Sequence, residues 1–204
     1  MTMPLWRAAQ PLVLASRSAP RRAMLEAAGL PVEISLPDLD ERAIEAAAGP
    51  LGPAEAAVLL ACEKAKVVAQ HSPDRLVVGA DQTLALGRRR FDKPRDRAAA
   101  QAQLMALSGN THQLHSAVAV VRGGEVLLAV VDTASLTMRR LSDKFLDAYF
   151  DAAGPAVLES VGAYQLEKLG IHLFERIEGD HFTILGLPLL PLIAFLRRDE
   201  CLAG

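Results

Sequence analysis

Short apolar runs alternate with helix-forming segments along this chain, and the alternation limits the folds that it can adopt. The run Pro11–Ser16 predicts a buried strand, and residues 19–28 predict a helix that ends at Gly29. A second short strand is expected over residues 32–35, followed by an acidic loop over residues 36–44. Because helices and strands alternate without an internal repeat, the sequence favours an α/β or α+β architecture.

The rest of the chain continues this alternation, and no low-complexity linker divides it. Residues 75–87 are expected to form a strand, a bend near Asp81 and a second strand. We therefore expect one folded unit with a cleft. The other expected elements are helices over 53–70, 95–107 and 141–154, two long strands around Gly123-Gly124, a strand and turn over 171–180, and a last helix that opens near Pro188.

Composition and charge exclude several classes of protein. The 204 residues are 51% hydrophobic and 23% charged, which is ordinary for a globular chain. A net charge of −2 lacks the basic excess that non-specific nucleic-acid binding needs, so we expect no nucleic-acid partner. Only two cysteines are present, which argues against a disulfide framework and fits a reducing cytoplasm.

No segment of the sequence reads as a membrane anchor. The N-terminus has no long apolar run behind basic residues, so we expect no signal peptide. The most apolar stretch, Phe182–Leu196, is interrupted by Gly186, Pro188 and Pro191. It is also shorter than the roughly 20 apolar residues that span a bilayer. The expected location is the cytoplasm, with no membrane partner.

A group of polar residues surrounds the start of the first helix. Ser16 and Ser18 follow the first strand, and Arg21 and Arg22 open the helix. Cations are disfavoured at a helix N-terminus, whereas hydroxyls, free N–H groups and guanidinium groups there bind phosphate well. The segment therefore predicts an anion site. The alternative is a helix capped by Ser18 with both arginines in solvent.

Two sets of carboxylates are candidates for chemistry. Asp81 follows the apolar run "LVVGA", at the kind of position where α/β sheets bind ligands. The acidic segment Asp38-Leu39-Asp40-Glu41 could hold a cation such as Mg²⁺. A strand-ending turn and a solvated acidic turn are the simpler alternatives.

The lysines and histidines give weaker indications of a functional site. Lys64 and Lys66 lie two apart on a helix, so only one of them can easily face a cleft. Lys93 lies in a loop that Pro94 stiffens. The five histidines have no metal-binding spacing, and we assign none of them a catalytic role.

These segments together resemble the Maf family of nucleoside triphosphate pyrophosphatases, from Pro11 to about Arg197. The resemblance implies one domain over residues 1–204. It rests on "LASRSAPRR", "DLDE", "EKAK", "GADQT", "DKP", "LSGNTH", "GAYQLEKLG" and "IEGDHFTILGLPL", in that order.

The resemblance implies an elongated, mixed-sheet α/β fold of the Maf/ITPase-like type, with a deep substrate cleft between two lobes. It also implies a cytoplasmic homodimer that uses a divalent cation, Mg²⁺ or Mn²⁺, to split a nucleoside triphosphate into monophosphate and pyrophosphate. The family's catalytic aspartate falls on Asp81, which would hold the metal together with Glu41. Phosphate binding falls on a set of five residues, namely Ser16, Ser18, Arg21, Lys64 and Lys93.

Three positions bear on the nucleobase. The branch of the family that acts on dTTP and UTP typically shows "SPRR", "ADT" and "GIQG", whereas this chain has Gln82 after the aspartate and Glu167 at the later position. Both resemble the branch that prefers 7-methyl-GTP, although Pro20 stands where that branch often has tryptophan. A carboxylate also suits the N–H donors and positive charge of 7-methylguanine.

Other functions remain open from the sequence. They are a dTTP or UTP pyrophosphatase, a house-cleaning hydrolase for deaminated purine nucleotides, and a non-catalytic nucleotide-binding regulator of septum formation. A tRNA-binding module is disfavoured by the charge balance and by an aromatic content of only 4%.

Overall fold

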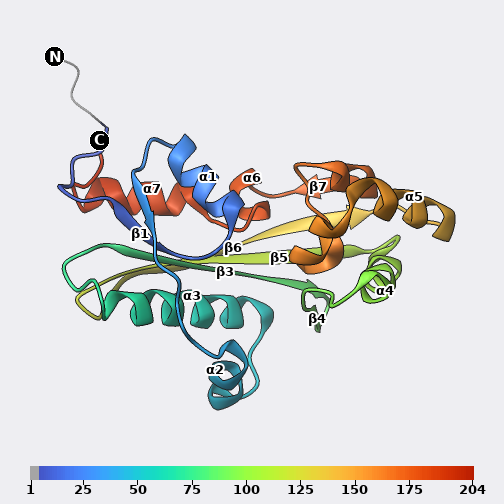
Figure 1. Cartoon of the computed structure of the whole chain (residues 1–204), viewed down its shortest axis with the longest axis horizontal. Helices are drawn as coiled ribbons and strands as arrows, with labels where there is room; N and C mark the ends of the chain where they lie inside the picture. Colours follow the sequence, from blue (N-terminus) through green and yellow to red (C-terminus); the bar gives the residue numbers. More distant parts are fainter. Residues whose placement is uncertain (1–4) are drawn as a thin grey trace.

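A computed structural model describes residues 5–204, so the first four residues of the expected domain lie outside the described residues. Across that range seven strands form one mixed sheet, with helices on both of its faces (Figure 1). The strands are β1 (Leu12–Ala15), β2 (Val32–Ile34), β3 (Val77–Leu86), β4 (Arg89–Phe91), β5 (Thr111–Arg122), β6 (Glu125–Met138) and β7 (Phe174–Glu178). The α-helices are α1 (Ala19–Ala27), α2 (Glu41–Ala48), α3 (Pro53–Ala69), α4 (Arg97–Leu107), α5 (Asp143–Ala153), α6 (His181–Ile184) and α7 (Leu189–Arg198).

The sheet order is β2-β1-β3-β5-β6-β7, and β4 pairs with β3. β1 is parallel to β2 and β3, and the other pairs are antiparallel. β1 pairs with β3 as far as Gly79, and β4 pairs with β3 only from Leu84. Between these points, from Ala80 to Thr83, β3 has no strand partner on that side among residues 5–204. We call this interval the β3 gap.

The two largest hydrophobic cores lie at opposite ends of the elongated sheet, and β3 runs from one to the other. Helix α3 lies along one face, while α1 and α7 cover the other face near β1 (Figure 1). Val78 and Ala80 of β3 belong to the core under α1 and α7, and Leu84 belongs to the core beside α4 and α5. Asp81 therefore lies where the two cores meet. The expected elongated, mixed-sheet α/β fold is confirmed.

Two local predictions are wrong. Residues 77–86 form one continuous strand with no bend, because β5 pairs with β3 at every position from Val77 to Ala85. The acidic segment is not a loop throughout, because Asp40 caps helix α2 by accepting hydrogen bonds from the N–H groups of Arg42 and Ala43. Glu41 is thereby the first residue of a helix.

Other local predictions are confirmed. Ser18 caps α1 through its side chain, as the alternative interpretation of that segment expected, although Arg21 does not point into solvent as that alternative required. The last helix begins directly after Pro188, and β5 and β6 turn at Gly123-Gly124. Within the described residues, no helix has the length and the apolar character needed to cross a membrane.

Candidate active site

Asp81 and Lys64 form a buried ion pair between β3 and α3. The Lys64 ammonium lies 2.6 Å from Oδ1 of Asp81, and the two residues are 9% and 8% exposed. α3 can approach β3 this closely because Gly79, two residues before Asp81 and on the same face of the strand, has no side chain. Lys66 points away and pairs instead with Glu63, so the expectation that only one of the two lysines faces the site is confirmed.

Glu41 reaches the same ammonium from α2. Its Oε1 lies 2.8 Å from Lys64 Nζ, so one cation lies between two carboxylates from different elements. We call Glu41, Lys64 and Asp81 the carboxylate cluster. The sequence prediction that Glu41 and Asp81 share a site agrees with this geometry, although Glu41 remains half exposed.

Arg21 lies beside the cluster and is firmly held. Its Nη1 donates to the carbonyl oxygen of Ala80 at 2.8 Å and to Oγ of Ser16 at 3.2 Å, and its Nε donates to the carbonyl of Gly186 at 2.8 Å. The Ala80 carbonyl lies in the β3 gap, where no strand competes for it. Arg22, in contrast, is exposed and pairs with Glu26. The two arginines therefore have different roles, and only Arg21 belongs to the site.

The electrostatic balance favours a basic carboxylate at position 81. Burial raises the pKa of Asp81 above its usual value of 3.8, Lys64 and Arg21 oppose that rise, and Glu41 adds to it. Burial also lowers the pKa of Arg21, against the stabilising charges of Asp81 and Glu41. A carboxylate with a raised pKa accepts a proton more readily than an ordinary aspartate, which suits a general base.

The oxygen ligands of the carboxylate cluster suit a hard divalent cation whose coordination shell is completed by a bound ligand. No three His, Cys, Asp or Glu side chains gather as a ready metal site anywhere in residues 5–204. Two carboxylates do converge on one position, at Lys64. Mg²⁺ is commonly held by one or two carboxylates together with phosphate oxygens and water. Glu41 and Asp81 therefore match a metal site that a phosphate substrate completes.

A separate hollow of about 450 Å³ opens beside α1, on the sheet face opposite α3. Pro20 and Glu167, two of the three positions expected to bear on the nucleobase, both line it. We call it the α1–α6 groove; its lining is Pro20, Ala23, Met24, Ala27, Ala28, Glu167, His181, Phe182, Leu185 and Leu189. Most of that lining is apolar, so Glu167 and His181 provide its charged and polar groups.

Gln82, the third expected base-specificity residue, is not among the residues that line the groove. Its amide nitrogen donates to Oγ of Ser116 at 2.8 Å and lies 3.2 and 3.1 Å from the carbonyl oxygens of Thr183 and Ile184. Successive residues of a strand point to opposite faces, so Gln82 points away from the side of Asp81. Its amide nitrogen ties α6, which lines the groove, to the sheet.

Among residues 5–204, the remaining expected site residues form no hydrogen bond or ion pair with the side chains of the carboxylate cluster. Ser16 Oγ accepts hydrogen bonds from Arg21 and from the N–H of Ser18, so both serines stay close to the guanidinium. Lys93 is exposed in the loop after β4, and no ion pair or hydrogen bond within the described chain connects it to the cluster. The structure thus brings together Ser16, Ser18, Arg21, Glu41, Lys64 and Asp81, but not Lys93.

Sequence reasoning missed His181 and Phe182 as groove residues. They form the first turn of α6, which Asp180 caps by accepting a hydrogen bond from the N–H of Thr183. An Asp that precedes an apolar segment is a cap signal, and it could have placed both residues on a helix start. Two of the histidines, His112 and His115, lie on β5, and both bond to neighbouring side chains.

Comparisons with known proteins show which family this chain is similar to. Residues 11–199 match the family of Maf-like proteins. A "Nucleoside triphosphate pyrophosphatase" of Bradyrhizobium diazoefficiens is 57% identical over 98% of this chain and 100% of its own length. A "7-methyl-GTP pyrophosphatase" of Brucella abortus is 49% identical over 95% of this chain and 98% of its own length. Among solved structures, a HAM1 protein from Coxiella burnetii covers 64% of this chain and 73% of its own at 18% identity and a TM-score of 0.42.

Proposed function

Because the chain belongs to the family of Maf-like proteins, we propose that its carboxylate cluster hydrolyses a nucleoside triphosphate to the monophosphate and pyrophosphate. The observation that carries the proposal is the Lys64 ammonium held between Glu41 and Asp81, with the Arg21 guanidinium beside them. Charged side chains from the three helices α1, α2 and α3 thereby meet Asp81 at strand β3. The high identity to relatives named pyrophosphatases supports the same reaction.

Asp81 is the proposed general base. A water molecule attacks the α-phosphorus in line with the bridging oxygen to the β-phosphate, and Asp81 takes the proton of that water. The P–O bond to the β-phosphate breaks, and the electron pair leaves with pyrophosphate. The raised pKa of the Asp81 carboxyl and its burial both support this role.

Arg21 and Lys64 are the proposed groups that stabilise the leaving pyrophosphate. Arg21 is fixed by hydrogen bonds to two backbone carbonyls, so its orientation is set before substrate arrives. Preorganised charges of this kind usually supply the largest share of catalysis. Ser16 and Ser18 support Arg21 and add hydroxyl groups near the phosphates. Lys93, on its exposed loop, is the proposed contact to the far end of the triphosphate.

Glu41 and Asp81 would hold a divalent cation, Mg²⁺ or Mn²⁺, together with phosphate oxygens of the substrate. When bound, such a cation neutralises charge that develops on the phosphates. Both carboxylates now face Lys64, so that side chain provides the positive charge that keeps them together without metal. With a cation bound to the two carboxylates, the Lys64 ammonium would contact the phosphates of the substrate.

The test is pyrophosphate release by wild-type protein, Asp81→Asn and Asp74→Asn. Asp74 is an exposed aspartate in the turn before β3 and serves as the matched control. We expect Asp81→Asn to lose at least 100-fold in turnover, the usual scale for a general base. We expect Asp74→Asn to keep wild-type turnover, and chelation of divalent cations to abolish activity. Near wild-type turnover by Asp81→Asn would refute its role.

We propose 7-methylguanine as the base that the α1–α6 groove accepts. Glu167 offers two acceptor oxygens to the adjacent N–H groups of guanine, and its charge complements the positive charge of the methylated ring. Phe182 offers an aromatic face to the same cation. The relative named 7-methyl-GTP pyrophosphatase supports this choice over dTTP and UTP.

Turnover of 7-methyl-GTP, GTP, ITP, UTP and dTTP tests which base the groove accepts. Wild-type protein should prefer 7-methyl-GTP by kcat/KM, and Glu167→Gln should lose most of that preference. Glu175→Gln, which changes an exposed carboxylate of β7 outside the groove, should keep the preference. Preference of the wild-type protein for UTP or dTTP would overturn the choice of base while leaving the reaction itself intact.

We also propose a homodimer, on the basis of the family resemblance. Size-exclusion chromatography with light scattering should give a mass twice the 21.8 kDa of one chain. A mass equal to that of a single chain at micromolar concentration would refute the dimer.

A further inference from the structure

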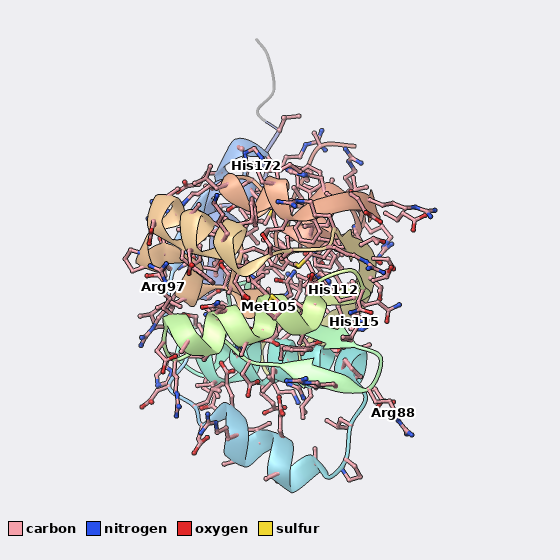
Figure 2. The ribbon with its side chains drawn as sticks, turned by 90° about the vertical axis from the view of Figure 1, so that its right-hand side faces the viewer. Arg88, Arg97, Met105, His112, His115 and His172 are labelled. Carbon is pink, nitrogen blue, oxygen red and sulfur yellow. The ribbon has the colours of Figure 1, made fainter. Side chains whose placement is uncertain are left out.

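Helix α2 carries Glu41, yet the helix has almost no hydrophobic attachment to the rest of the protein. None of its residues is buried, and both views show it standing apart from the sheet on the far side of α3 (Figures 1 and 2). Ile44 is its only half-buried apolar side chain. Burial of apolar surface is what usually docks a helix, so some other interaction has to keep α2 in place.

Two ion pairs supply that attachment. Glu41 contacts Lys64 at 2.8 Å, and Glu45 accepts two hydrogen bonds from the guanidinium of Arg90, at 3.0 and 2.9 Å. Glu41 and Glu45 are four residues apart, so they lie on the same face of α2. One face of the helix is therefore fixed at two points, and only the first of them belongs to the carboxylate cluster.

Arg90 is itself fixed to the strand that carries the proposed base. It lies on β4 opposite Ala85, and Ala85 is four residues beyond Asp81 on β3. Its two parallel bonds to Glu45 form a fork, which specifies orientation as well as distance. Hydrogen bonding to Glu45 also raises the pKa of Arg90. The fork is partly buried, with side-chain exposures of 28% and 30%.

We propose that the Glu45–Arg90 fork is a latch that positions α2, so that Glu41 stays at Lys64 and Asp81. Glu45 and Arg90 are positioning residues that do not contact the substrate. The inference rests on the proposed function only in giving Glu41 a part in the reaction. The latch itself is a property of the protein without metal or nucleotide.

The first test measures hydrogen exchange of the protein without metal or nucleotide. Glu45→Gln and Arg90→Gln should each speed exchange of the α2 amides roughly fivefold, the scale of one partly exposed ion pair. Exchange in α4 and α5 should not change. Asp151→Asn is the matched control, because it breaks the exposed Arg97–Asp151 pair between α4 and α5. It should leave exchange of α2 unchanged.

The second test is a charge swap. The single variants should lower kcat/KM and raise the Mg²⁺ concentration for half-maximal activity, each roughly fivefold. Glu45→Arg combined with Arg90→Glu rebuilds the pair in reverse and should recover slow α2 exchange and most of the activity. Because α2 buries no side chain, all these variants should keep the wild-type Tm within a few degrees.

Unchanged α2 exchange in both single variants would overturn the latch, as would a double variant that exchanges as fast as the single ones. These outcomes are independent of the proposed function, because exchange is measured without metal or nucleotide. If the wild-type protein hydrolyses no nucleotide while the exchange results hold, the proposed function fails and the latch stands.

Discussion

Gly79 lies so close to Ala65 that a Cβ at position 79 would stand 2.9 Å from the Cβ of Ala65. The same Cβ would collide with the carbonyl oxygen of Ala61. Lys64 directly precedes Ala65, and Asp81 lies two residues beyond Gly79. This contact between α3 and β3 therefore sets the separation at which Lys64 and Asp81 meet.

Gly79→Ala should reduce both stability and turnover, because the added methyl group pushes α3 away from β3. We expect a loss of about 3 kcal/mol in the free energy of unfolding, at the upper end for overpacking a core. Urea denaturation measures it. Gly52→Ala is the control, since a Cβ there meets only the flexible side chain of Glu55. Equal urea midpoints for the two variants would contradict the expected collision.

The Asp81 carboxyl should titrate above pH 3.8 in protein free of metal. Burial raises its pKa, Lys64 lowers it and Glu41 raises it. Lys64→Met should therefore move the midpoint to higher pH, and Glu41→Gln should move it to lower pH. The ¹³C chemical shift of the Asp81 carboxyl reports each midpoint. A wild-type midpoint at or below 3.8 would remove the electrostatic argument for a general base.

His112 should make the fold sensitive to acid. Burial lowers its pKa from 6.5 to about 4, and its Nε2 lies 2.7 Å from the hydroxyl of Tyr164. As pH falls from 6.5 to 4, the unfolded chain takes up a proton at this position and the folded chain does not, so stability is lost. The full shift corresponds to about 3 kcal/mol.

Denaturant unfolding at several pH values between 7 and 4 tests this prediction. His112→Gln should flatten the decline of the unfolding free energy over that window. His71→Gln, at an exposed histidine after α3, should leave the decline unchanged. If His112→Gln and wild-type protein lose stability in parallel, the source of the acid sensitivity is elsewhere.

Gln82→Leu should loosen α6. The amide nitrogen of Gln82 donates to Oγ of Ser116 and lies within 3.2 Å of the carbonyl oxygens of Thr183 and Ile184, so its loss removes hydrogen bonds between the sheet and α6. The Thr183 carbonyl still accepts from Ser116. A cost of about 1–3 kcal/mol is expected. Hydrogen exchange should rise at α6, whereas Gln70→Leu, at an exposed position after α3, should not affect it. Unchanged hydrogen exchange at α6 would show that the hydrogen bonds of Gln82 do not hold α6 to the sheet.

Local signals in the sequence predicted most elements of the fold. Ser18 marks a helix start and Gly29 marks a helix end, because caps depend on a few neighbouring residues. The false bend at Asp81 had a different origin. Gly-Ala-Asp resembles the end of a strand, and only pairing with β5, more than 30 residues away, shows that the strand continues.

The site was predicted in part. Its residue types were recognisable, but the division of Arg21 and Arg22 into a held and an exposed side chain depends on where Ala80 and Gly186 lie. The attachment of α2 could not be read from sequence either. Glu45 and Arg90 are 45 residues apart, and nothing local to either of them indicates that they meet.

In the β3 gap a side chain takes the place of a strand, because Arg21 donates to the Ala80 carbonyl there. Asp81 and Gln82 are neighbours in the chain, but their side chains leave the strand toward opposite layers. The carboxylate cluster lies on one face of the sheet and the α1–α6 groove on the other. A molecule that engages both at once has to reach past the Arg21 guanidinium at the Ala80 carbonyl, so this one side chain stands between the two binding regions.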